Sequence, residues 1–385
     1  MAATSNIAGD ELGAAIAMAP HPSFLLLHIL GGNFVRPGFD VVRTARIVRR
    51  VVDETGLDLR GLDVLTEAAT GPFAATAAMA AFAGADEVVA LARDSSFGSA
   101  EDAFAATTRL AQELGATKPL RFITSLSEEV VNAATIITNC RHLRPLDRAV
   151  VESMNPQAVV SLMYEGWEHR PGDVDRTACE ERHIPLVGTN EMDPRVGVFD
   201  YLGPAATKLL TDAGFEILRT RVLLVCDNPF RPFLRDHLSR CGAAVETVET
   251  LNDELPGGAI DVVLVAAKPG VKVTIGPTEA RRLAIAYPGT CVAQFWGDLD
   301  RAALLSLGIS VWPLDSPGAG RMGILLSDLG PEPAVRLQAG GLKVGEILAR
   351  ARQLDHSHDG YVNAIRAAID SGFGSPLDGQ EELLK

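Results

Sequence analysis

The sequence lacks paired cysteines, clusters of positive charge and long apolar runs, and each absence excludes a class of protein. Its five cysteines stand singly, with no CxxC pair and no histidine cluster at ligand spacing. An odd number of isolated cysteines in a chain of 385 residues indicates free thiols in a reducing compartment and argues against structural zinc. We therefore expect no bound metal and a cytoplasmic location.

Positive charge is scarce. The chain carries 35 Lys and Arg against 49 Asp and Glu, a net charge of −14, and it has no Lys/Arg-rich run. Nucleic acid and anionic membrane surfaces are therefore not expected partners. No apolar stretch approaches the roughly 18 residues of a membrane-spanning helix. We expect a small-molecule substrate and, because alanine-rich α/β enzymes of this kind are commonly dimers, a homodimer.

Apolar runs that alternate with helical spacing fill most of the chain, and the length suggests two domains. One set of expected strands lies near 63–67, 87–92, 120–124, 134–138, 158–163 and 184–189. A second set lies near 221–226, 244–248, 261–266, 290–295 and 309–313. This pattern predicts an α/β fold with two doubly wound parallel-sheet domains, one Rossmann-like and a smaller one flavodoxin-like, and a cleft between them.

We divide the chain into four segments. Residues 1–60 are expected to form a strand and helix on a domain edge, with a strand at 23–30 and a core or cleft histidine, His28, near Asn33. Residues 61–198 are assigned to the Rossmann-like nucleotide-binding domain and 199–345 to the second, substrate domain. Residues 346–385 form a helix and a polar tail with His356 and His358, either an oligomer arm or a cover for the second domain.

The stretch 63–95 has the pattern strand, turn, helix, strand. The turn Ala69-Thr70-Gly71 is made of small residues, which lets a phosphate approach the helix N-terminus. Asp94 closes the second strand, where an acidic residue binds ribose hydroxyls or caps a helix. Arg93 and the serines beside Asp94 are also suited to bind the 2′-phosphate of NADP, so this stretch is compatible with either cofactor. The predicted cofactor residues are Thr70, Gly71, Pro72, Phe73, Asp94, Ser95, Asn139 and Asn190.

Residues 130–200 carry a more specific pattern. A strand ending in Thr138-Asn139 is followed by RHLRPLDRAVVESMNPQAVVSLM and then by GDVDRTACEERHIPLVGTNEMDP. With the 63–95 unit, this resembles the cofactor domain of the D-2-hydroxyacid dehydrogenase superfamily and, more distantly, of S-adenosylhomocysteine hydrolase. Arg144-Pro145-Leu146-Asp147 stands for that superfamily's PLT-like turn. The resemblance implies an NAD(P)-binding Rossmann domain.

The sequence departs from that superfamily at its functional positions. Only Gly71 remains of the glycine fingerprint, and residues 164–167 replace the arginine that usually follows the fifth strand. No histidine is paired with a glutamate in the family's manner. In that superfamily the substrate domain comes largely before the cofactor domain, whereas here most of it comes after. A hydroxyacid substrate and a catalytic triad are therefore not carried over.

Polar and aromatic side chains at the expected strand ends are the candidates for chemistry. His142 titrates near neutrality and can pass the proton that accompanies a hydride. The predicted catalytic residues are His142, Tyr164, Glu165 and Glu191. The predicted substrate-binding residues are Arg144, Trp167, Asp227, Asn228, Lys268 and Trp296. All three tryptophans follow strand ends, which favours an aromatic-lined cleft.

These observations predict an NAD(P)-dependent oxidoreductase that acts on a small polar substrate between two domains. The nicotinamide is expected near Asn139 and His142, with NAD and NADP both open. Two alternatives remain: an enzyme that uses S-adenosylmethionine or another adenosine ligand, and a non-catalytic two-domain ligand-binding protein.

Overall fold

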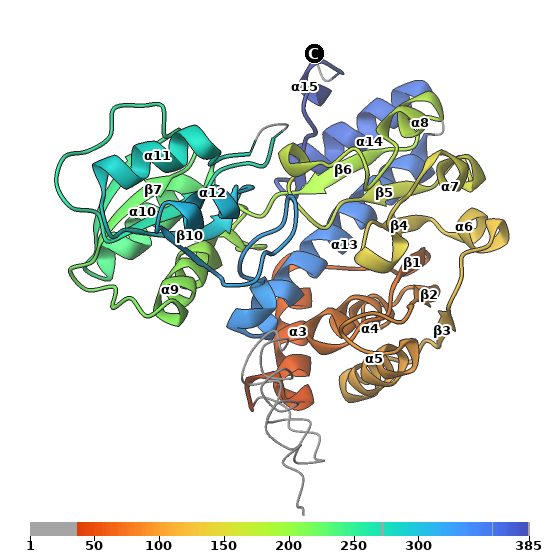
Figure 1. Cartoon of the computed structure of the whole chain (residues 1–385). Helices are drawn as coiled ribbons and strands as arrows, with labels where there is room; N and C mark the ends of the chain where they lie inside the picture. The colour runs from red at the N-terminus through yellow and green to blue at the C-terminus, as the bar shows by residue number, and fades with distance from the viewer. Residues whose placement is uncertain (1–36, 271–272, 356, 384–385) are drawn as a thin grey trace, which may run out of the picture.

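The chain forms two α/β units that lie side by side (Figure 1). This computed structural model describes residues 37–270, 273–355 and 357–383. The strand expected at 23–30, with His28 and Asn33, lies outside the described residues, as does His356. Within the described parts, no helix is both long and apolar enough to cross a membrane. The larger unit contains a seven-stranded sheet and the smaller unit a five-stranded sheet.

The larger sheet has the Rossmann strand order. Its six parallel strands run in the order β6-β5-β4-β1-β2-β3. A seventh strand, β12 (Gly374–Ser375), pairs antiparallel with β6 at the edge. The switch point of this order, where ligands bind in such sheets, lies between β1 and β4. The parallel strands are β1 (Asp63–Glu67), β2 (Glu87–Leu91), β3 (Leu120–Ile123), β4 (Ile136–Thr138), β5 (Val159–Ser161) and β6 (Leu186–Thr189).

Helices cover both faces of the larger sheet, and each layer encloses its own apolar cluster. The first layer consists of α3 (Val41–Thr55), α4 (Ala75–Phe82), α5 (Ala100–Leu114), α13 (Pro331–Leu354) and α14 (His358–Asp370). The opposite layer consists of α6 (Glu128–Ala133), α7 (Arg148–Ser153) and α8 (Arg176–Glu181). Within the described part of residues 1–60, α3 packs in the first layer against α5 and α13 and not on the expected domain edge.

The smaller unit has the flavodoxin-like strand order. Its five strands are all parallel and run in the order β11-β10-β9-β7-β8. They are β7 (Arg221–Val225), β8 (Ala244–Val248), β9 (Val262–Ala266), β10 (Cys291–Trp296) and β11 (Ser310–Trp312). Helices α9 (Leu202–Asp212) and α10 (Phe230–Arg240) contact one apolar cluster, and α11 (Pro277–Ala286) and α12 (Arg301–Ser306) contact the other.

Helix α13 returns the chain to the larger unit (Figure 1). It contacts α3, α4 and the strands β4, β5 and β6. The boundary expected at residue 345 therefore differs from the structure, because the whole helix belongs to the larger unit. The C-terminal tail also differs from the expectation of an oligomer arm or a cover for the second domain. Helix α14 packs on α13, and β12 extends the larger sheet. One face of α14 carries apolar residues at helical spacing, and the burial of this face explains why the helix packs on the larger unit. The residues are Tyr361, Ala364, Ile365 and Ala368.

An aromatic cluster joins the two units. Trp167, in the 3-10 turn η4 (Gly166–Glu168) after β5, lies 5.7 Å from the ring of Phe230 and 5.9 Å from the ring of Trp296. Both of these partners belong to the smaller unit. The edge-to-face geometry is the arrangement that aromatic quadrupoles favour. The cluster therefore fixes how the carboxyl end of the larger sheet faces the smaller unit.

We predict that Gly188→Ala in β6 destabilises the protein by about 1–3 kcal/mol, since overpacking a rigid contact has this magnitude. An added Cβ would overlap the backbone nitrogen of Gly166 and lie 2.6 Å from its Cα. Gly172→Ala is the control, because nothing lies within 4 Å of its Cβ position. Urea unfolding of both variants measures the difference. Equal stability would show that η4 moves without strain.

Candidate functional site

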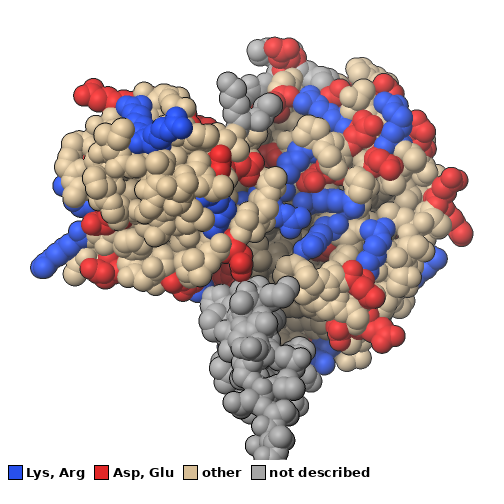
Figure 2. Space-filling model, in the orientation of Figure 1, with Lys and Arg blue, Asp and Glu red and all other residues tan. Residues whose placement is uncertain are grey.

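A cleft of about 980 Å³ opens over the carboxyl end of the larger sheet. One wall consists of residues that follow β1, β2 and β4, on both sides of the switch point. The opposite wall is the segment 312–328, which joins β11 to α13, and Leu337 and Gln338 of α13 close the end. Figure 2 shows Lys and Arg side chains grouped on the larger unit beside its junction with the smaller one. The sheet topology therefore brings this cleft to the position where Rossmann folds bind ligands.

Part of the predicted site lines this cleft. The predicted residues found there are Thr70, Gly71, Pro72, Phe73, Ser95, His142 and Arg144. The cleft is also lined by Glu67, Arg93, Cys140, Arg141 and Arg321, which are not among the predicted site residues, although Arg93 was considered as a ligand for a 2′-phosphate. The first four follow or end predicted strands, so their position was readable from the sequence, but the direction of each side chain was not.

Glu67 is a buried carboxyl at the end of β1, only 5% exposed. Its Oε2 accepts a hydrogen bond of 3.1 Å from the backbone N–H of His142. Burial raises the pKa of Glu67 to about 7, against the lowering effects of that hydrogen bond and of Arg144 and Arg141. A carboxyl with this pKa gives or accepts a proton near neutral pH.

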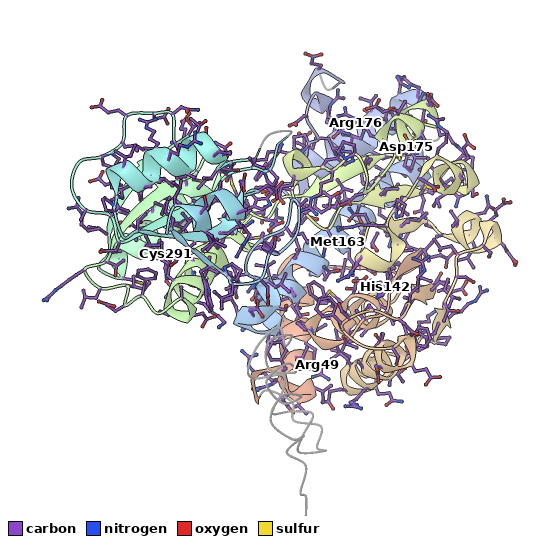
Figure 3. All side chains as sticks on the ribbon, viewed as in Figure 1. Arg49, His142, Met163, Asp175, Arg176 and Cys291 are labelled. Atoms are coloured by element: carbon purple, nitrogen blue, oxygen red, sulfur yellow. The ribbon has the colours of Figure 1, made fainter. Side chains whose placement is uncertain are left out.

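His142 lies in the 3-10 turn η3 (Arg141–Leu143), which folds over the end of β1. Burial lowers the pKa of its imidazole, and the neighbouring Arg141 and Arg93 lower it further. Its carbonyl accepts a hydrogen bond of 2.6 Å from Arg93 Nη1. Figure 3 labels His142 and Met163 on the larger unit, far from Cys291 in the smaller one. These effects favour the neutral imidazole, and it is the backbone N–H of His142 that contacts Glu67.

A buried polar network lies beneath the cleft. Gln338 Oε1 accepts a hydrogen bond of 2.8 Å from Thr76 and lies 3.5 Å from the thiol of Cys140. Thr66 and Thr138 share a hydroxyl contact of 2.8 Å across β1 and β4. Burial raises the pKa of Cys140 to about 12. Burial therefore favours the neutral thiol over the nucleophilic thiolate.

Three predicted cofactor residues do not line the cleft because their side chains bind the backbone elsewhere. Asn139 Oδ1 accepts from the Met163 N–H at 2.7 Å, which ties β4 to the loop after β5. Asn190 Nδ2 donates to the Gly372 carbonyl at 2.8 Å. Asp94 Oδ1 accepts from the Ala100 N–H at 2.9 Å. This is the first N–H of helix α5, whose N-cap residue is Ser99.

The predicted catalytic group at the ends of β5 and β6 is brought together, but outside the cleft lining. Glu165 Oε1 accepts a hydrogen bond of 2.7 Å from the Glu191 N–H. Burial, and then repulsion from Glu168 and Glu165, raises the pKa of Glu191 well above its ordinary range. The Tyr164 hydroxyl donates to Asp173 at 3.1 Å, and burial raises its pKa. These groups therefore form a neighbouring buried cluster.

The predicted substrate residues of the smaller unit have structural contacts. Asn228 Nδ2 donates to the Ala266 carbonyl at 2.7 Å, and Asp227 Oδ1 accepts from the Lys268 N–H at 2.9 Å. The ammonium of Lys268 donates to the Trp167 carbonyl and lies 5.5 Å from that ring. With Trp296 in the aromatic cluster, these residues shape turns and join the units. Of the three tryptophans, Trp312 lines the cleft.

No family model matches the chain, and no curated protein is detectably similar in sequence. Among solved structures, a dipicolinate synthase chain from Bacillus subtilis matches with a TM-score of 0.50 at 11% identity, over 77% of this chain and 99% of that chain. A dipicolinate synthase chain from Bacillus halodurans has a TM-score of 0.47 at 13% identity, over 73% of this chain and 96% of that chain. An NAD-dependent formate dehydrogenase from Staphylococcus aureus, in complex with NAD, has a TM-score of 0.40 at 14% identity, over 70% of this chain and 96% of that chain.

These likenesses concern the fold alone. The Bacillus subtilis match, together with the strand orders of the two sheets, confirms the predicted fold class of two parallel-sheet α/β units. The Rossmann-like fold expected from the D-2-hydroxyacid dehydrogenase resemblance is likewise confirmed.

We predict that Asp94→Ala lowers the unfolding free energy by about 1 kcal/mol, the usual net effect of losing one intramolecular hydrogen bond. Asp94→Asn keeps an acceptor for the Ala100 N–H and should stay close to the wild type. Thermal and urea unfolding measure both variants. Equal losses in the two would show that the charge, not the hydrogen bond, stabilises α5.

We also predict a pH-dependent difference in stability between the wild type and Glu67→Gln. The pKa of Glu67 is raised from 4.5 to about 7, so the folded protein keeps a proton that the unfolded chain has released. The stability from this proton is present below pH 4.5 and is lost as the pH rises through about 7. Relative to the variant, the wild type should lose about 3 kcal/mol between about pH 4.5 and about pH 8.

Urea unfolding across this pH range measures the loss of stability. Glu101→Gln, which removes an exposed carboxylate from helix α5, is the control. Parallel pH profiles for the wild type and Glu67→Gln would contradict the raised pKa.

Proposed function

We propose that this protein is an NAD(P)-dependent oxidoreductase that acts on a small polar substrate in the cleft over the larger sheet. The observation that carries the proposal is the position of Glu67. A buried carboxyl that titrates near neutral pH lies at the switch point of a Rossmann sheet, inside a cleft lined by arginines.

The cleft residues fit a dinucleotide with one departure from the usual pattern. A volume of about 980 Å³ is at the upper end of ligand sites. Gly71 has φ +61°, and nothing lies within 4 Å of its Cβ position, so the turn leaves room for a ligand. Pro72 lacks an N–H, which reduces the amide contribution to a diphosphate site. The guanidinium group of Arg321, on the opposite wall of the cleft, supplies positive charge instead.

A bound nicotinamide cofactor would supply or accept the hydride, and the residues of this chain would manage the proton. In alcohol oxidation, the Glu67 carboxylate takes the hydroxyl proton of the substrate; in carbonyl reduction, its protonated form returns one. The His142 N–H holds Oε2 in place. The neutral imidazole of His142 is available as a hydrogen-bond partner for the substrate. The segment 312–328 forms the wall of the cleft opposite these residues.

The two alternatives have less support. A methyltransferase sheet would end in an antiparallel hairpin, whereas β12 joins the sheet from the C-terminal part of the chain and forms no hairpin with β6. A non-catalytic binding protein would have no use for a proton-transfer group in its cleft. The convergence of Glu67 and His142 therefore favours an enzyme.

The test has two parts. Calorimetric titration with NADH, NADPH and S-adenosylmethionine should show binding of a nicotinamide cofactor. A panel of polar carbonyl compounds, followed by loss of nicotinamide absorbance, then supplies a substrate. Failure of both nicotinamide cofactors to bind would overturn the proposal, and binding of S-adenosylmethionine alone would replace it.

With that substrate, we predict that Glu67→Gln lowers kcat by about 10²-fold or more, the contribution of a positioned acid or base. Glu165→Gln, a buried exchange outside the cleft, is the matched control and should keep turnover. In the reduction direction kcat of the wild type should fall as the pH rises through about 7, because the protonated form of Glu67 is needed. An unchanged kcat in Glu67→Gln would exclude this residue as the proton carrier.

A further inference from the structure

The end of β2 determines which ribose a Rossmann fold accepts. An acidic side chain there binds the 2′-hydroxyl of NAD, and an arginine accommodates the 2′-phosphate of NADP. In this chain the strand is followed by Ala92, Arg93, Asp94 and Ser95. Both kinds of side chain are present, so the direction in which each one points decides the preference.

The acidic side chain does not line the cleft. Asp94 accepts a hydrogen bond from the Ala100 N–H at the start of α5 instead. The cleft lining between β2 and α5 consists of Arg93, Ser95, Phe97, Gly98, Ser99 and Ala103, without a carboxylate. The feature that selects an unphosphorylated ribose is therefore missing from this wall.

Two arginines converge on the same wall. Arg93 Nη1 donates to the His142 carbonyl at 2.6 Å, and the Arg141 guanidinium lies 5.0 Å from the centre of the Phe97 ring. Within the described residues, neither arginine forms an ion pair. In a chain with a net charge of −14, two cleft arginines that form no ion pair among the described residues favour an anionic ligand.

An exposed aromatic ring lies next to this pair. Phe97 is 58% exposed at the tip of a tight turn, which is closed by hydrogen bonds between Ser95 and Gly98. Thr70 Oγ1 donates to the Phe97 carbonyl at 3.2 Å and so ties this turn to the loop after β1. An accessible ring beside a guanidinium is a stacking platform for a purine base. The Ser95 Oγ accepts from the Phe97 N–H at 3.2 Å, which leaves its hydroxyl proton for a ligand.

We propose that Arg93, Arg141 and Ser95 bind the 2′-phosphate of NADP(H), with the adenine against Phe97, so that the protein prefers NADP(H) to NAD(H). The proposal rests on the proposed function, because it assigns the adenosine end of the same cleft. It replaces the ribose contact that the sequence suggested for Asp94.

The test compares NADPH with NADH by calorimetric titration of the full-length wild type, Arg93→Gln and Arg141→Gln. Wild type should bind NADPH at least about tenfold more tightly than NADH, a difference of about 1.4 kcal/mol. Each variant should lose most of that preference and keep its affinity for NADH. Arg109→Gln removes the same charge from the exposed face of α5, outside the cleft, and should retain the preference.

A second measurement keeps the test independent of the nicotinamide end. Adenosine 2′,5′-bisphosphate should displace NADPH more effectively than adenosine 5′-monophosphate, and Ser95→Ala should reduce this difference. Circular dichroism and thermal unfolding establish that each variant is folded. Equal or tighter binding of NADH in the wild type would overturn the NADP preference and leave the oxidoreductase proposal standing. Binding of neither cofactor would overturn both.

Discussion

The close contact between helix α13 and the larger sheet is the constraint on which the cleft depends. An added Cβ at Gly341 would overlap Met163 Sδ, and one at Gly345 would lie 2.6 Å from a methyl group of Ile136. Backbone and sheet therefore approach at a distance that only glycine permits. At this distance Gln338 reaches Thr76 and the thiol of Cys140 beneath the cleft. The segment 312–328 is drawn across the opening because it must connect β11 to this anchored helix.

Most of the fold could be predicted because parallel strands are continuous apolar runs. The predicted strands at 63–67 and 244–248 have the bounds of β1 and β8, and the other nine differ from the structure by a residue or two at an end. The missing strand, β12, has only the residues Gly374–Ser375, which carry no apolar pattern. Its position is determined by α14 packing on α13. The predicted end of the second domain at residue 345 assumed that the chain completes one unit before it starts the next. No local sequence pattern shows that α13 returns to the larger unit.

The site was predicted less well, because strand ends fix where a residue lies but not where its side chain points. Arg93 and Asp94 are neighbours, yet one lines the cleft and the other accepts a hydrogen bond from the start of α5. Trp167 and Trp296 were expected together in an aromatic-lined cleft, and their rings do lie 5.9 Å apart, but in a contact that joins the units and outside the cleft lining. Glu67 was visible as a strand end, but its raised pKa arises from burial under η3. Such effects depend on tertiary contacts.

The return of α13 also orders events during synthesis of the chain. The strands of the larger sheet leave the ribosome first, but the helix that covers one of their faces follows only after the whole smaller unit. Val335, Leu342 and Leu348, buried on that face in the finished protein, have not yet been made at that stage. The smaller unit, whose strands and helices are contiguous between 202 and 312, completes its core earlier. The nascent larger unit therefore exposes an apolar surface while the smaller unit is being translated. Such a surface makes a chain prone to aggregation and a target for chaperones.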